Sequence, residues 1–94
     1  MTVLWLPEAL ADLERVCEFL VERDSTAAMR ALRAIEAATD RLEALPEIGQ
    51  PIGDRTGRRQ LFVAFGAGAY VLRYRLHHND IVVIRVWHSR ELQG

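Results

Sequence analysis

The 94-residue sequence contains no lysine, and all twelve of its basic residues are arginine. Mechanisms that need a lysine base, a lysine Schiff base or the lysine of a phosphate-binding P-loop are therefore excluded. The single cysteine, Cys17, excludes an intramolecular disulfide and a cysteine-based zinc site. No apolar run approaches the roughly 20 residues of a membrane-spanning helix, and the N-terminal residues lack the basic segment of a signal peptide. We therefore expect a cytoplasmic protein without membrane contact.

The length predicts one domain, residues 1–94, and the charged fraction of 27% is typical of a globular chain rather than a disordered one. The charges are unevenly distributed. Residues 1–47 hold ten acidic residues and five arginines, a net charge of −5, whereas residues 48–94 hold three acidic residues and seven arginines, a net charge of +4. This asymmetry predicts one surface that binds an anion or an acidic partner, although genomic base composition also favours arginine over lysine.

The acidic half has the pattern of a short strand followed by two helices. The strand covers residues 2–6, and Pro7 suits the first turn of a helix. Apolar residues recur at spacings of three and four along this helix, which predicts a buried stripe of Leu10, Leu13, Cys17, Leu20 and Val21. Its carboxylates, including Glu8 and Asp12 in the first turn, are expected on the solvated face.

The second helix is predicted over residues 26–45, with Asp24 or Ser25 as its cap and Pro46 as its end. Its expected buried stripe consists of Ala28, Leu32, Ile35, Thr39, Leu42 and Leu45. Two helices of similar length joined by a tight link form a helical hairpin.

The basic half has the pattern of a loop over 46–57 and three strands over 60–65, 69–76 and 81–88, joined by turns at 66–68 and 77–80. The element order β-α-α-β-β-β predicts an α+β fold, in which the helical hairpin packs on one face of an antiparallel sheet. The first strand must join this sheet or remain an unpaired edge.

Strict alternation sorts the side chains of the last two strands by face. The face toward the helices is expected to hold Tyr70, Leu72, Tyr74 and Leu76 with Val82, Ile84, Val86 and His88. The other face then presents Arg73, Arg75, Arg85 and Trp87. Like charges on paired strands are destabilising unless an anion or acidic partner binds them or the side chains extend into water. Because exposure of the apolar Trp87 indole to water is unfavourable, we favour the interpretation that this face binds phosphate or carboxylate.

The sequence offers little support for other chemistry. His77 and His78 are adjacent and point to opposite faces, so they cannot chelate a metal as a pair, and we expect neither a metal nor a cofactor. No serine has a histidine and an acid at a recognisable spacing. A histidine at a strand end, such as His88, is more often structural than catalytic.

Four short fragments, taken in order, resemble the RelE/ParE family of bacterial toxins, the killing components of type II toxin–antitoxin pairs. They are Leu45-Pro46-Glu47-Ile48-Gly49, Arg59-Gln60-Leu61, Tyr70-Val71-Leu72-Arg73-Tyr74 and Ile84-Arg85-Val86-Trp87-His88-Ser89-Arg90-Glu91. The resemblance covers nearly the whole chain and agrees with the expected element order.

The resemblance implies one of two activities. RelE-like toxins cut mRNA in the ribosomal A site, and for such a nuclease the candidate catalytic residues here are Arg59, Arg73, Arg85 and His88. ParE-like toxins instead trap DNA gyrase on cleaved DNA. The catalytic lysines of the nucleases have no counterpart in this chain, and no tyrosine follows His88. Arginine is a poor proton carrier. We therefore favour the ParE-like activity, in which the toxin is a binding inhibitor rather than an enzyme, and keep mRNA cleavage as the alternative.

The resemblance also implies a cognate antitoxin, encoded by a small upstream gene, whose C-terminal segment folds as it binds the toxin. The two proteins would form a hetero-oligomer. The residues expected to bind a partner are Arg73, Arg75, Arg85, Trp87 and Arg90, and reversing the charge of Arg85 is expected to weaken the complex with the antitoxin.

Overall fold

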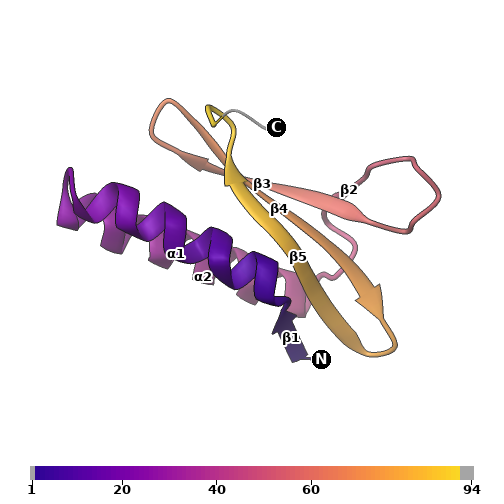
Figure 1. Ribbon diagram of the computed structural model, residues 1–94. Helices are drawn as coiled ribbons and strands as arrows, with labels where there is room; N and C mark the ends of the chain where they lie inside the picture. The colour runs from indigo at the N-terminus through magenta and orange to yellow at the C-terminus, as the bar shows by residue number, and fades with distance from the viewer. Residues whose placement is uncertain (1, 92–94) are drawn as a thin grey trace.

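A computed structural model describes residues 2–91 of the chain, which form two helices and one five-stranded sheet (Figure 1). The elements are β1 (Thr2–Trp5), α1 (Pro7–Val21), α2 (Ser25–Ala44), β2 (Gln50–Pro51), β3 (Arg59–Phe65), β4 (Gly68–His77) and β5 (Asp80–His88). The predicted order of elements is confirmed. One element was not predicted: the two-residue strand β2 lies inside the segment 46–57, which the sequence indicated as a loop.

The strand order in the sheet is β1-β5-β4-β3-β2. Strands β3 to β5 pair antiparallel, as expected, and the unpredicted β2 pairs antiparallel with β3. The first strand does join the sheet, but it pairs parallel with β5, where Thr2 lies opposite Asp80 and Trp5 opposite Val83. The sheet is therefore mixed, and α1 and α2 lie side by side against one of its faces (Figure 1).

The helix boundaries follow the predicted signals closely. Pro7 is the first residue of α1. The carboxylate of Asp24 caps α2 by accepting hydrogen bonds from the backbone N–H groups of Thr26 and Ala27, at 2.9 and 3.3 Å. This helix ends at Ala44, directly before Leu45 and Pro46, because the residue before a proline disfavours the helical conformation. No helix in the described part of the chain is long and apolar enough to cross a membrane.

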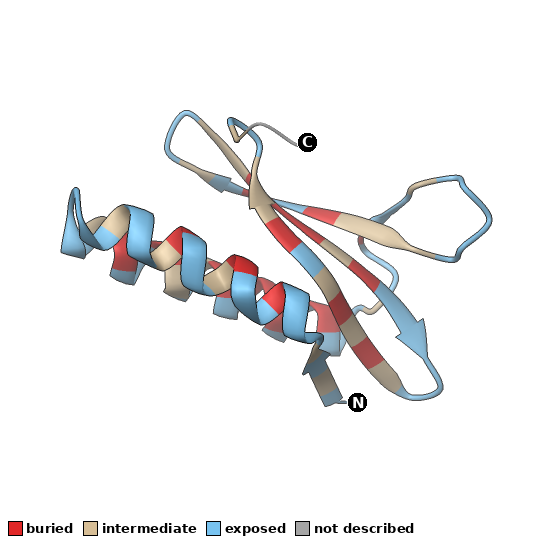
Figure 2. Ribbon diagram, viewed as in Figure 1, coloured by how far each residue is buried: buried red, intermediate tan, exposed pale blue. Residues whose placement is uncertain are grey.

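The buried stripes of the helices differ from the expected ones (Figure 2). In α1 the buried residues are Ala9, Asp12 and Val16, whereas Leu10 and Val21 are about half exposed, at 48% and 57%. In α2 they are Ala28, Ala31, Ile35, Ala38, Thr39 and Leu42. Leu45 lies beyond the end of α2 and is exposed, and Leu32 is only half-buried. Small alanines occupy the inner faces, so the stripe of large apolar residues does not mark the side of each helix that packs most deeply.

The prediction of strict alternation in β5 was wrong over half of the strand. Arg73 lies opposite Arg85, but the next residue, Tyr74, lies opposite Val83, so one extra residue of β5 interrupts the pairing. Such a bulge reverses which side chains face the core. Ile81 and Val83 are fully buried in the core, in place of Val82 and the bulged Ile84. Beyond the bulge, the predicted core position of Val86 is confirmed.

Candidate functional site

The sheet separates the sequence-predicted site residues into two groups. On the helix-covered face, His88 lies opposite Tyr70, a core residue, and their rings meet edge to face at 5.0 Å. On the opposite face, which no helix covers, Arg73 is the neighbour of Gln60, and Trp87 is the neighbour of Val71. The candidate nuclease residues His88 and Arg73 therefore belong to opposite faces of the sheet. We call the uncovered side the open face.

The open face carries an apolar row beside its cations. Phe62, Val71 and Trp87 lie opposite one another on β3, β4 and β5, and Phe62 is 50% exposed. Arg73 borders this row: its Nε and Nη2 donate to Oε1 of Gln60 at 3.2 and 2.7 Å, and its guanidinium carbon lies 5.1 Å from the centre of the Trp87 ring. Trp87 and Arg73, which were predicted to share one surface, lie next to each other on the open face.

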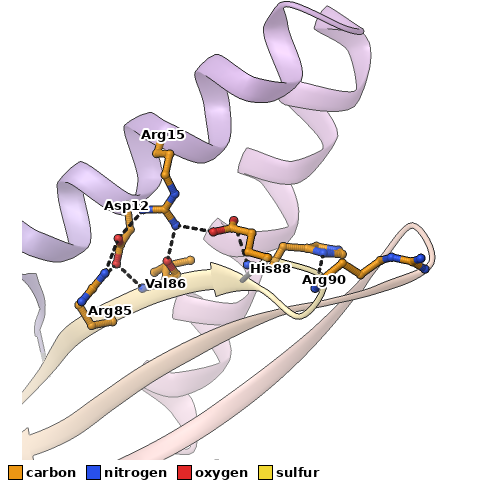
Figure 3. Close-up of polar contacts among 7 residues, drawn as sticks. Asp12, Arg15, Arg85, Val86, His88 and Arg90 are labelled. Atoms are coloured by element: carbon orange, nitrogen blue, oxygen red, sulfur yellow. Dashed lines mark hydrogen bonds and ion pairs between the residues drawn. The ribbon is translucent and has the colours of Figure 1, made fainter. Parts of the chain in front are cut away.

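Arg85 lies opposite Arg73 but is paired with an acidic residue of its own chain (Figure 3). Its Nε and Nη2 donate to the two carboxylate oxygens of Asp12, at 2.8 and 3.1 Å. The same carboxylate accepts the backbone N–H of Val86 at 2.8 Å and a hydrogen bond from Arg15 at 2.6 Å. The like charges of Arg73 and Arg85 are thus tolerated because α1 supplies an internal counter-ion.

Asp12 is the residue that sequence reasoning missed. It was expected on the solvated face of α1, but it is 2% exposed. Its spacing from Ala9 and Val16 places Asp12 on the same side of the helix as these two residues. This spacing was a weak signal, because an alanine is found on buried and exposed faces alike. Burial alone would raise the pKa of the Asp12 carboxyl, but hydrogen bonds from Arg85, Val86 and Arg15 outweigh that effect and lower the pKa below its usual value.

A second carboxylate extends this network to the end of β5. Glu91 accepts a hydrogen bond from Arg15 at 3.0 Å through one oxygen, and from the backbone N–H of His88 at 3.2 Å through the other (Figure 3). Asp12 and Glu91 therefore satisfy two backbone N–H groups along the outer edge of β5, beyond the segment that β1 covers.

Both ring nitrogens of His88 have partners within the fold. Nε2 lies 3.1 Å from the carbonyl oxygen of Phe65, and Nδ1 lies 3.2 Å from the backbone N–H of Arg90. These partners assign the tautomer, with Nε2 donating to Phe65 and Nδ1 accepting from Arg90. The ring therefore helps to hold the end of β5 against the end of β3.

Arg59 likewise makes structural contacts. Its Nη1 donates to the carbonyl oxygens of Glu47 and Gly49, at 3.1 and 2.8 Å. The hydroxyl of Tyr74 holds the same segment, because it donates to the carbonyl of Pro46 and accepts the N–H of Gly49, both at 2.9 Å. Arg59 and Tyr74 together fix the chain between α2 and β2.

A largely apolar cleft of about 510 Å³ lies between the C-terminal half of α1 and the ends of β3 to β5. Val16, Phe19, Leu20, Phe65 and Tyr70 line it, with Arg90 at its polar side. Burial raises the pKa of the Tyr70 hydroxyl to about 12, so this group is neutral at physiological pH. Arg90 therefore lies beside this cleft, whereas Arg75 is an exposed residue of β4.

No group of three or more histidine, cysteine, aspartate or glutamate side chains within residues 2–91 is placed to hold a metal ion. The arrangement consists instead of a cation-bearing open face, an internal carboxylate–arginine network and an apolar cleft. These features are suited to binding other macromolecules.

A helical hairpin packed on one face of a five-stranded sheet is the architecture expected of the RelE/ParE fold. The family model for the ParE toxin of the type II toxin–antitoxin system parDE matches residues 3–93. The chain therefore belongs to this family and is the toxin component of a type II toxin–antitoxin pair, for which the family implies a cognate antitoxin.

Two relatives from Caulobacter vibrioides carry the name RelE. Toxin RelE1 is 42% identical over 90 residues, which cover 96% of this chain and 95% of the relative. Toxin RelE3 is 34% identical over 85 residues, which cover 90% of each protein. Among solved structures, the chromosomal ParDE toxin–antitoxin system from P. aeruginosa matches with a TM-score of 0.67 and 17% identity, over 94% of this chain and 95% of that chain. This structural match confirms the fold.

Proposed function

We propose that this toxin inhibits DNA gyrase by binding it and stabilising cleaved DNA, without making or breaking bonds itself. The observation that carries the proposal is the placement of His88 on the helix-covered face, away from Arg73 on the open face. A nuclease site built on His88 and Arg73 would need both groups around one phosphate.

The chemical requirements of RNA cleavage support the same conclusion. Attack by a 2′-hydroxyl needs a base, a cation for the developing charge and an acid for the leaving oxygen. His88 is the one member of the candidate set with an imidazole, the side chain that most often acts as a general base, and both of its ring nitrogens are engaged by Phe65 and Arg90. Arg59 is held by backbone carbonyls and Arg85 by Asp12. Among the arginines of this set, Arg73 donates to the Gln60 side chain instead and could stabilise charge, but it cannot supply a base.

Ribosome-dependent mRNA cleavage is the alternative, and the names of the two Caulobacter relatives favour it. Under that alternative the catalytic set would be Arg59, Arg73, Arg85 and His88. Binding of RNA would also depend strongly on salt, because each phosphate contact releases counter-ions.

Two assays with the purified toxin separate these functions. With gyrase and supercoiled plasmid we expect linear DNA after the protein is denatured, and with translating ribosomes we expect intact mRNA. His88→Ala, checked for folding, should retain the gyrase effect, and His77→Ala at the exposed end of β4 is the matched control. Cleavage of mRNA that is lost in His88→Ala and kept in His77→Ala would replace the gyrase proposal with the ribosomal one.

The antitoxin is proposed to bind the cations that the toxin leaves without an internal counter-ion. Arg73 and Arg75 on β4, with Trp87 beside them, suit acidic and apolar side chains of a segment that folds on binding. Arg90 would extend the contact toward the apolar cleft. Arg85 contributes less to this interface than its sequence pattern indicates, because Asp12 already neutralises it.

A further inference from the structure

The apolar cleft beside the end of β5 has walls from both layers of the fold. Val16, Phe19 and Leu20 come from the C-terminal half of α1, and Phe65 and Tyr70 come from the end of β3 and the start of β4. Val16 and Tyr70 are buried, whereas Phe19 is 54% exposed. The volume of about 510 Å³ lies within the range of pockets that hold small organic molecules.

The hydroxyl of Tyr70 is a polar group inside this apolar cleft. It forms no hydrogen bond within residues 2–91, although Tyr70 is only 2% exposed. Among these residues no side-chain oxygen is both fully enclosed and without a partner. Because Tyr70 lines the cleft, its hydroxyl therefore opens into it. Burial raises the pKa of this hydroxyl to about 12, so it keeps its proton at neutral pH and can donate to an acceptor that enters the cleft.

The charged groups around the cleft favour an anion. Arg15, Arg90 and Glu91 line it, so one positive charge is in excess. Both oxygens of Glu91 already accept hydrogen bonds from groups of the fold, at 3.0 and 3.2 Å. Arg90 has a partner only for its backbone N–H within residues 2–91, and its guanidinium points away from the Arg15–Glu91 contact (Figure 3). The guanidinium carbon of Arg23 lies 3.7 Å from the centre of the Phe19 ring and adds a further cation.

We propose that this cleft binds a small carboxylic acid with an apolar body, such as an aryl-alkyl or medium-chain acid. The apolar body would fill the space between α1 and the strand ends. The carboxylate would accept a hydrogen bond from the hydroxyl of Tyr70 and pair with the guanidinium of Arg90. The site is separate from the open face, and the inference does not depend on the identity of the toxin's target.

The size of the cleft favours a small molecule over a macromolecule. A protein interface of standard size uses about 20 to 30 residues on each side, whereas nine residues line this cleft. An apolar wall with few polar groups that point to one place is the usual composition of a small-molecule site. A carboxylic acid would supply in one group the acceptor that Tyr70 lacks and the anion that Arg90 lacks.

The free toxin can be tested with 4-phenylbutyrate and octanoate as probes, and with 4-phenylbutyramide as the matched neutral probe. In NMR titrations both acids should cause saturable shifts of the Leu20, Phe65 and Tyr70 signals. We expect 4-phenylbutyrate to bind about tenfold more tightly than the amide. At about five times its Kd, it should raise the midpoint of thermal unfolding by roughly 5 °C. Failure of both acids to saturate would overturn the proposal, as would equal affinity for acid and amide.

Substitutions assign the two polar contacts. Arg90→Gln should weaken the binding of 4-phenylbutyrate about tenfold, and Arg75→Gln, which removes an exposed cation of β4, is the matched control and should bind like the parent. Tyr70→Phe should weaken binding about threefold while the protein stays folded, because it removes only a hydroxyl without a partner in residues 2–91. Unchanged affinity in Arg90→Gln would overturn the anion site.

The location of the shifted signals provides the last check. Shifts confined to Phe62 and Trp87 would place the acid on the open face and overturn the proposal. The same would follow if the cleft signals moved with toxin concentration alone, since a second copy of the toxin would then occupy the cleft. Neither gyrase nor the antitoxin enters these experiments, so their outcome is independent of the gyrase assay.

Discussion

The carboxylate of Asp12 on α1 accepts the backbone N–H of Val86 on β5, at 2.8 Å. The helix thereby supplies the hydrogen bond that a further strand would otherwise make. The same carboxylate holds Arg85 and Arg15, so one buried acid ties the first helix to the last strand and neutralises a cation of the sheet.

Replacing Asp12 with alanine should lower the free energy of unfolding by about 2 to 3 kcal/mol. Most of the loss comes from the unsatisfied N–H of Val86, because the side chains of Arg15 and Arg85 are about half exposed, at 44% and 50%, and regain water. Urea denaturation measures the change, and Glu14→Ala, on the exposed side of α1, is the control. Equal stabilities of the two variants would contradict this role.

Asp12 also predicts how stability depends on acid. Its pKa is lowered in the folded state, so its contribution is complete above the unfolded value of about 3.9 and is lost as the pH falls through the folded value. The difference in unfolding free energy between the parent and Asp12→Asn should therefore shrink between about pH 5 and about pH 2. Urea titrations of both proteins across this range test it, and a constant difference would mean that the charge of Asp12 contributes nothing.

The burial of Asp12 and the bulge in β5 were not predicted from the sequence. Helix boundaries, hairpins and the order of the elements depend on local signals such as Pro7, Asp24 and Pro46, and these were predicted. The burial of Asp12 depends on its contact with Val86, which is remote in sequence. The bulge in β5 reversed the faces of Ile81 to Ile84, and no local residue type marks it.

The candidate site was likewise predicted only in part. Alternation correctly placed His88 and Arg73 on opposite faces, because both lie on the same side of the bulge as the β3–β4 turn. The pairing of Arg85 with Asp12 could not be predicted, since it joins two elements whose relative placement is a property of the tertiary fold. The sequence did not indicate the exposed edge of β3 either. That edge is exposed because β2 is short and only its residues Gln50 and Pro51 pair with β3.

Tyr74→Phe should destabilise the toxin by about 1 to 3 kcal/mol, because the buried N–H of Gly49 loses its acceptor and the carbonyl of Pro46 loses its donor. Tyr70→Phe is the matched control, because its ring is about as deeply buried, whereas its hydroxyl makes no hydrogen bond within residues 2–91 and the residue lines the apolar cleft. Thermal and urea denaturation should show that Tyr74→Phe is clearly less stable than Tyr70→Phe. The reverse order of stability would contradict the role of Tyr74 in holding the segment before β2.

Arg75→Glu and Arg85→Glu should have different effects, although both reverse a charge on the sheet. Arg75 is exposed and makes no side-chain hydrogen bond within residues 2–91, so its reversal should leave stability unchanged and weaken antitoxin binding severalfold, mainly through slower association at low salt. Arg85→Glu places a carboxylate beside Asp12 and should lower the free energy of unfolding.

Binding kinetics and urea denaturation distinguish the two effects, with Arg33→Glu on the exposed side of α2 as the control. If Arg75→Glu binds the antitoxin like Arg33→Glu, the antitoxin does not depend on the cations of the open face.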